Sequence, residues 1–177
     1  MTIIAAAYDS PTSYAIAADS YSVVNGIRIP NAHKVVRAGP VLIGGAGCNH
    51  ETSAGLAWMA GRSWTVHRDI RVALAGMRKY ILEETERNGD CKGLDSHYIA
   101  VGPDGVYLLG SNGGIMQAPS RWAIGCGEDV ALGAMWERPG APVDVVALAV
   151  RAACGLREGC FGGPVVLGSE ATATPSP

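Results

Sequence analysis

The sequence has little of the features that mark several classes of protein. Its 177 residues carry a formal net charge of −2, and the longest basic run is Arg78-Lys79. Nucleic-acid binding relies on a basic surface, so a nucleic-acid partner is not expected. The longest later apolar run, Val145 to Val150, ends at charged residues far short of the ~20 residues that a membrane helix needs. The start also lacks the basic segment of an export signal, which predicts a cytoplasmic protein without membrane contact.

Sequence motifs for metal, phosphate and serine chemistry are missing as well. There is no G-x-S-x-G, no H-E-x-x-H and no G-x-x-x-x-G-K-[ST], and the four histidines share no ligand spacing. The five cysteines contain no C-x-x-C pair, and their odd number and wide spacing predict reduced thiols instead of a disulfide framework. The sequence therefore predicts neither a bound metal nor a cofactor.

Small apolar residues, in contrast, are plentiful. Hydrophobic residues make up 48% of the chain, with 24 glycines and one phenylalanine, so a core of Ala, Val, Ile and Leu is expected. A chain of this length fits one domain, which we assign to residues 1–168. Residues 169–177 are low in complexity and predict a disordered carboxyl-terminal tail.

The order of the predicted elements favours an α+β fold. A β-hairpin is expected around the turn at residues 9–13, followed by further strands up to residue 47 and a short helix near 51–59. A long helix is predicted from Asp69 to Arg87, because apolar residues recur at helical spacing and Asp69 can cap its start.

The second half of the chain repeats this order. It predicts a hairpin at 97–109, a strand at 122–125, two helices between 128 and 156, and a last strand at 164–167. Helices in consecutive pairs argue against a doubly wound parallel sheet, and they favour antiparallel sheets layered with helix pairs.

Thr2 is the first candidate for chemistry. Because threonine is small, Met1 can be removed, which would leave Thr2 with a free α-amine. Such a residue holds a nucleophile and a base together, since an amine with a pKa of about 7.7–8.0 can take the proton from the hydroxyl. Many cytoplasmic proteins also begin Met-Thr, and there the threonine is an ordinary residue.

Asp19 and Lys34 are charged residues at the ends of apolar strands. Asp19 closes the run that starts at Ile16, and Lys34 precedes Val35. A carboxylate in such a place must be paired or lie at the edge of the sheet. A lysine beside it can lower the pKa of a hydroxyl and stabilise the alkoxide that develops. Taken singly, Asp19 can also be a turn residue and Lys34 a solvated lysine.

A glycine-rich segment, Ile43-Gly-Gly-Ala-Gly47, joins a predicted strand to a helix. Glycine lets a backbone N–H approach a substrate closely, and such a donor can stabilise the oxyanion of acyl transfer. The glycines at 44 and 45 would leave room near the nucleophile. A phosphate cradle is the competing interpretation, although its usual glycine patterns do not occur here.

These landmarks and their order resemble the bacterial HslV peptidase and proteasome β-subunits. The matching residues are Thr2, Asp19 in A-A-D-S, Lys34 in H-K-V-V-R, and the segment I-G-G-A-G-C that contains Gly47. The resemblance covers nearly the whole chain. It implies the N-terminal nucleophile hydrolase fold, a four-layer αββα sandwich in which two antiparallel sheets are flanked by helix pairs. It also implies Thr2 as nucleophile and base, Asp19 and Lys34 as a supporting ion pair, and Gly47 as the oxyanion donor.

Two segments differ from the family pattern. Family members carry a G-S-G segment whose serine lies near the nucleophile, and here Cys126 takes the place of that serine. Proteasomal subunits carry an Arg-Asp pair followed shortly by Ser-Gly. In this chain Glu158 keeps the carboxylate, whereas Phe161 supplies no hydroxyl.

The resemblance implies a threonine peptidase that hydrolyses amide bonds. A polypeptide substrate would bind as an added strand beside Tyr21 to Val23 and beside Gly45 in the glycine-rich segment. A closed homo-oligomeric ring is implied, and a separate ATP-dependent unfoldase is left open as a partner. Two alternatives remain: a small-molecule amidohydrolase of the same fold, and a catalytically inactive ring-forming scaffold or binding homologue that keeps Met1.

Overall fold

The computed structural model describes residues 2–24, 27–30, 33–62, 69–88 and 94–169. Met1 and residues 170–177 of the expected tail lie outside these ranges. Ser169, where the expected tail begins, is bonded to the turn of the first hairpin. Its N–H donates to the carbonyl of Tyr14 and its hydroxyl to the carbonyl of Thr12, both at 2.8 Å.

The first sheet contains the start and the end of the described chain. Its strands run antiparallel in the order β10-β1-β2-β11. They are β1 (Ile3–Ser10), β2 (Ser13–Asp19), β10 (Arg121–Gly125) and β11 (Pro164–Gly168). The register pairs Ile3 with Gly125 and Ile4 with Ala18. The beginning of β1 therefore lies between the end of β10 and the end of β2.

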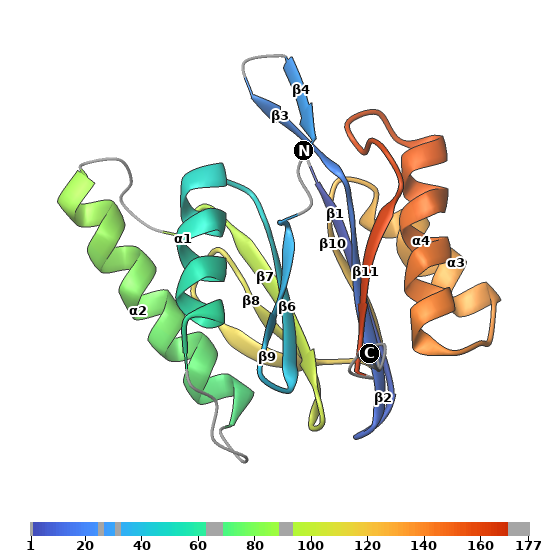
Figure 1. Cartoon of the computed structure of the whole chain (residues 1–177), viewed down its shortest axis with the longest axis horizontal. Coiled ribbons are helices and arrows are strands. Elements are labelled where there is room, and N and C mark those ends of the chain that lie inside the picture. Colours follow the sequence, from blue (N-terminus) through green and yellow to red (C-terminus); the bar gives the residue numbers. More distant parts are fainter. Residues whose placement is uncertain (1, 25–26, 31–32, 63–68, 89–93, 170–177) are drawn as a thin grey trace, which may run out of the picture.

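The second sheet has five antiparallel strands in the order β5-β6-β7-β8-β9. They are β5 (Val35–Ala38), β6 (Val41–Ala46), β7 (His97–Gly102), β8 (Gly105–Leu109) and β9 (Ile115–Ala118). A separate two-stranded hairpin is formed by β3 (Tyr21–Val24) and β4 (Ile27–Pro30). This hairpin projects beyond the two sheets at the end of the molecule where the chain starts (Figure 1).

Two helix pairs lie on the outside of the two sheets (Figure 1). Helices α1 (Asn49–Ala60) and α2 (Ile70–Asn88) cover the second sheet, and α3 (Glu128–Glu137) and α4 (Pro142–Leu156) cover the first. The start of α2 is capped as expected, because Oδ1 of Asp69 accepts the N–H of Arg71 at 2.8 Å.

Strand β1 shows why the sequence is so rich in small apolar residues. Side chains alternate between the two faces of a strand. Ile3, Ala5 and Ala7 pack against α3 and α4, whereas Ile4 and Ala6 pack against the second sheet. With both faces covered, the strand reads as a continuous apolar run, and alanine keeps the layers close together.

The mixed α/β architecture with antiparallel sheets and two helix pairs was predicted correctly. Strand β9 was not predicted, and β3 was expected only as an edge for substrate. Within the ranges that the structure describes, no helix is long and apolar enough to cross a membrane.

Candidate active site

Thr2 lies immediately before β1 and lines a cavity of about 200 Å³. Its carbonyl accepts the N–H of Cys126 at 2.8 Å, which continues the pairing between β1 and β10. Gly125, one residue earlier, has φ of +101°, and a Cβ there would lie 2.1 Å from the Thr2 carbonyl oxygen. The backbone of Thr2 is therefore held by a turn that only glycine fits.

Asp19 and Lys34 form a buried ion pair next to Thr2. Nζ of Lys34 lies 2.9 Å from Oδ1 of Asp19, and their side chains are 4% and 0% exposed. The same Oδ1 accepts the N–H of Ile3 at 3.0 Å, and Lys34 also donates to the carbonyl of Tyr21. Two buried charges must compensate each other. The pair thus fixes the residue that follows Thr2 and places an ammonium at the cavity, which Lys34 also lines.

The second oxygen of Asp19 binds the loop after α4. Oδ2 accepts the N–H of Phe161 at 3.4 Å. The ring of Phe161 is in turn covered by the guanidinium of Arg28, which lies 3.6 Å from the ring centroid. The sequence showed only that Phe161 lacks a hydroxyl. In the structure this residue connects the ion pair to the β3–β4 hairpin.

Gly47 stands at the end of β6, where φ is +136°. A Cβ at this position would lie 2.6 Å from the carbonyl oxygen of Asp95 and 2.7 Å from Cα of Ser96. Both the backbone conformation and the close approach of residues 95–96 therefore require glycine. Gly45 also lines the cavity, and its N–H is bonded to the carbonyl of Lys34 at 3.3 Å.

Glu51 holds the segment that packs beneath Gly47. Its side chain is fully buried, and both carboxylate oxygens accept the N–H of Asp95, at 3.1 and 2.9 Å. The hydroxyl of Tyr98 donates to the Glu51 carbonyl at 2.7 Å. Burial, and then the charge of Glu51, raise the pKa of Tyr98 well above its usual value. The sequence did not single out Glu51, although an acidic residue at the start of an apolar helix was a usable signal.

Cys126 faces the loop after α4. Its Sγ lies 3.0 Å from Sγ of Cys160 and 3.8 Å from the carbonyl of Glu158. The thiol of Cys160 donates to the Cys126 carbonyl at 2.7 Å. The Glu158 side chain is exposed, so the structure brings the backbone of this residue to Cys126 and leaves its carboxylate at the surface. The partner thiol at Cys160 was not foreseen from the sequence.

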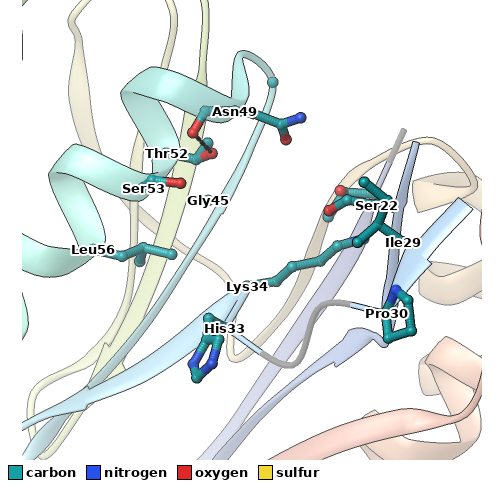
Figure 2. Close-up of a pocket in the computed structure, with 12 residues that line it drawn as sticks. Ser22, Ile29, Pro30, His33, Lys34, Gly45, Asn49, Thr52, Ser53 and Leu56 are labelled. Carbon is teal, nitrogen blue, oxygen red and sulfur yellow. Dashed lines mark hydrogen bonds between the residues drawn. The ribbon is translucent and has the colours of Figure 1, made fainter. Parts of the chain in front are cut away.

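The cavity lies between α1 and the β3–β4 hairpin. Figure 2 shows Asn49, Thr52, Ser53 and Leu56 on the α1 side, facing Ser22, Ile29 and Pro30, with His33 and Lys34 between them. The Thr52 hydroxyl is bonded to the carbonyls of Cys48 and Asn49 at the start of the helix. On β3 it is Ser22 that lines the cavity. Its neighbours Tyr21 and Val23, named from the sequence, point to the other face of the strand, as the alternation of side chains requires.

Four of the cysteines, Cys48, Cys126, Cys154 and Cys160, are free thiols, and Cys91 lies outside the described residues. Across the described part of the chain, no group of three or more His, Cys, Asp or Glu side chains could hold a metal ion. The cavity brings the Thr2 hydroxyl together with the ammonium of Lys34 and the glycine turn at Gly47, and further polar side chains line it at Ser22, His33, Asn49, Thr52 and Ser53.

Comparison with solved structures shows that other proteins share this fold. No family model and no curated protein matches the sequence. Among solved structures, BPH from Thiobacillus denitrificans is similar, with 18% identity and a TM-score of 0.77 over 95% of this chain and 97% of that one. Its complex with epoxomicin gives 17% identity and a TM-score of 0.75 over the same shares. Eukaryotic HslV from Trypanosoma brucei is 15% identical, with a TM-score of 0.71 over 95% of this chain and 98% of that one. The resemblance to HslV-like proteins seen in the sequence is thus confirmed at the level of the fold.

Proposed function

We propose that this chain, which has the fold of HslV-like proteins, is a threonine peptidase of the N-terminal nucleophile class with Thr2 as its nucleophile once Met1 is removed. The observation that carries the proposal is that Thr2 lines the same cavity as Lys34, whose ammonium is held in a buried ion pair with Asp19. Asp19, Lys34 and Gly47 come from three separate segments of the chain. A buried ion pair contributes little to the stability of a fold, so a role in the reaction is a better explanation for this pair beside the Thr2 hydroxyl.

The proposed reaction is acyl transfer to Thr2. The free amine of Thr2 takes the hydroxyl proton while Oγ attacks the scissile carbonyl, and the N–H of Gly47 binds the oxyanion. The ammonium of Lys34 stabilises the developing alkoxide, and Asp19 holds Lys34 and the backbone of Ile3 in place. The proton then passes to the leaving amine, and water releases the acyl group by the reverse path.

The proposed substrate is an extended peptide between β3 and the glycine-rich segment, with its backbone beside Tyr21 to Val23 and Gly45. One substrate side chain would enter the cavity lined by Ser53 and Leu56. The volume of about 200 Å³ is below the ~300–1,000 Å³ of pockets that enclose a drug-sized ligand, and it supports entry of one side chain of a longer substrate.

A single four-layer αββα domain over residues 1–168 that forms a closed homo-oligomeric ring in the cytoplasm is part of the same proposal. The fold shared with HslV from Trypanosoma brucei supports it. A ring would place the cavities inside a chamber, and a separate ATP-dependent unfoldase would then feed polypeptides to it.

One observation favours a second function. Two residues that stand where the family has a serine and an acidic residue do not contact the cavity. Cys126 contacts Cys160, and the side chain of Glu158 is exposed. A catalytically inactive ring-forming scaffold would tolerate these changes and would keep Met1.

Intact mass spectrometry with an epoxyketone separates the two functions. An epoxyketone forms a ring with both the hydroxyl and the free amine of an N-terminal threonine, and epoxomicin is the compound present in one of the similar structures. The enzyme is expected to lack Met1 and to gain one inhibitor mass, and Thr2→Ala is expected to gain none. A chain that keeps Met1 and stays unlabelled would contradict the role of Thr2 as nucleophile and would favour the scaffold.

A further inference from the structure

Cys126 and Cys160 form a pair of thiols that the proposed mechanism does not use. Their Sγ atoms are 3.0 Å apart, and a disulfide bond would bring them to about 2.05 Å. The thiols come from two turns, one after β10 and one after α4, that are 34 residues apart in the sequence. Both side chains already point at each other, so bond formation requires only a small approach of the two turns.

The two thiols differ in their access to solvent. Cys126 is half-buried, whereas Cys160 is 1% exposed and donates its proton to the Cys126 carbonyl. Burial and the hydrogen bond with Cys126 raise the pKa of Cys160 far above its usual range. Cys126 is therefore the thiol that a dissolved oxidant reaches first, and Cys160 is the neighbour that reacts second.

Each cysteine is connected to the candidate active site through the backbone. The N–H of Cys126 donates to the carbonyl of Thr2 at 2.8 Å. The residue after Cys160 is Phe161, whose N–H donates to Oδ2 of Asp19 at 3.4 Å. Drawing the two turns together must therefore change the positions of the groups that bind Thr2 and Asp19.

We propose that Cys126 and Cys160 are a site of reversible oxidation by hydrogen peroxide, and that the resulting disulfide lowers the reactivity of Thr2. The Cys126 thiolate attacks the peroxide, the O–O bond breaks, and the oxygen that leaves is protonated to water. The sulfur of Cys160 then attacks the sulfenic acid of Cys126, the S–O bond breaks, and a second water leaves. The two thiols lose two electrons and two protons, and the peroxide is reduced to two molecules of water.

The disulfide is tested without any enzymatic activity. The full-length protein is treated with a small molar excess of hydrogen peroxide, alkylated and digested with trypsin. Cleavage after Arg121, Arg151 and Arg157 puts Cys126, Cys154 and Cys160 on three different peptides. The expected product is a cross-link between the first and the third peptide, together with the loss of two hydrogen masses from the intact chain and recovery on treatment with dithiothreitol.

Cys154→Ala is the matched control for this chemistry. Cys154 is a half-buried thiol on α4, and burial raises its pKa to about 11, so it should remain unreacted. The Cys154→Ala variant is expected to form the same cross-link, and Cys160→Ala is expected to form none and to keep its circular dichroism spectrum. A cross-link through Cys154, or sulfinic acid at Cys126 with no cross-link, would overturn the proposal.

The effect on Thr2 rests on the proposed function and is measured separately. Epoxyketone labelling of the oxidised protein should fall several-fold and return after reduction, whereas labelling of Cys160→Ala should not respond to peroxide. If the cross-link forms and labelling is unchanged, the link to Thr2 is wrong. If the reduced protein is not labelled at all, the proposed peptidase function fails, and the cross-link alone decides the oxidation site.

Discussion

Oδ1 of Asp19 accepts a hydrogen bond from the N–H of Ile3 at 3.0 Å, while the same oxygen contacts Nζ of Lys34 at 2.9 Å. One buried atom therefore connects the backbone next to the proposed nucleophile to the ammonium of Lys34, which lines the cavity. This arrangement separates two effects of Lys34, one on the fold and one on the reaction.

Replacing Lys34 with Met should abolish labelling of Thr2 while the fold persists. Methionine keeps the unbranched stem of the side chain without its charged end, which leaves Asp19 buried without its counter-ion but still bonded to the N–H of Ile3. Removing one partner of a buried ion pair typically costs about 3–5 kcal/mol. We expect a loss of unfolding free energy in this range, measured by urea denaturation, and no epoxyketone adduct by mass spectrometry.

The control for this variant is Lys79→Met. Lys79 forms an exposed i,i+4 pair with Glu83 on α2, at 3.8 Å. Exposed pairs contribute at most about 1 kcal/mol, so both stability and labelling should stay close to those of the original protein. Undiminished labelling of Lys34→Met would remove the lysine from the proposed mechanism.

Replacing Gly125 with Ala should displace Thr2. The left-handed φ costs about 1–2 kcal/mol for any other residue, and the new Cβ would lie 2.1 Å from the Thr2 carbonyl oxygen. We expect a loss of more than about 2 kcal/mol of unfolding free energy and a large drop in the labelling rate.

The same substitution at Gly133 should raise the stability of the protein instead of lowering it. Gly133 is an exposed residue within α3, and a Cβ there would meet no atom within 4 Å. Alanine in a helix is favoured over glycine by about 0.5–1 kcal/mol, so thermal unfolding should show a more stable protein with normal labelling. Equal effects of the two substitutions would contradict the role assigned to the turn at Gly125.

The regular elements could be predicted because their signals are local. The apolar residues of α2 recur at helical spacing, and all four, Ile70, Leu74, Met77 and Ile81, are buried. Strand β9 carries no such signal. Met116 at its centre is 62% exposed, and the strand forms through its pairing with β8 at the edge of the sheet. Short edge strands of this kind depend on the neighbour more than on their own sequence.

The candidate site divides in the same way. Thr2, Asp19 and Lys34 were recognised because each stands at the end of an apolar run and the three follow the order of a known family. Glu51 and Cys160 were missed because their partners are distant in the sequence, namely the N–H of Asp95 and the thiol of Cys126. Every residue except proline has a backbone N–H, so the sequence does not reveal which residue donates such a bond.

Replacing Glu51 with Ala should slow the reaction without changing the affinity for substrate. Glu51 holds Asp95, whose carbonyl packs beneath the proposed oxyanion donor Gly47. A hydrogen bond to a charged group contributes about 1.5–3 kcal/mol, so some stability is lost as well. We expect a lower kcat with a nearly unchanged KM for a fluorogenic peptide. Glu83→Ala removes an exposed glutamate from α2 and should change neither value. An equal change in kcat and KM would indicate a general loosening of the fold and not the displacement of an oxyanion donor.

Replacing Ser53 with Phe should narrow the cavity and change which peptides are cleaved. Ser53 points into the cavity from α1 (Figure 2), and its side chain is exposed, so the larger ring can be accommodated without disturbing the core. The KM for peptides with a large side chain before the scissile bond should rise by about tenfold or more, since excluding a buried side chain costs about 1.5–3 kcal/mol. Peptides with alanine at that position should be nearly unaffected.

The control is Ala57→Phe, which places the same ring one helical turn away on an exposed residue that does not line the cavity. It should leave the cleavage of both classes of peptide unchanged. If Ser53→Phe and Ala57→Phe give the same preference, the substrate side chain does not enter this cavity.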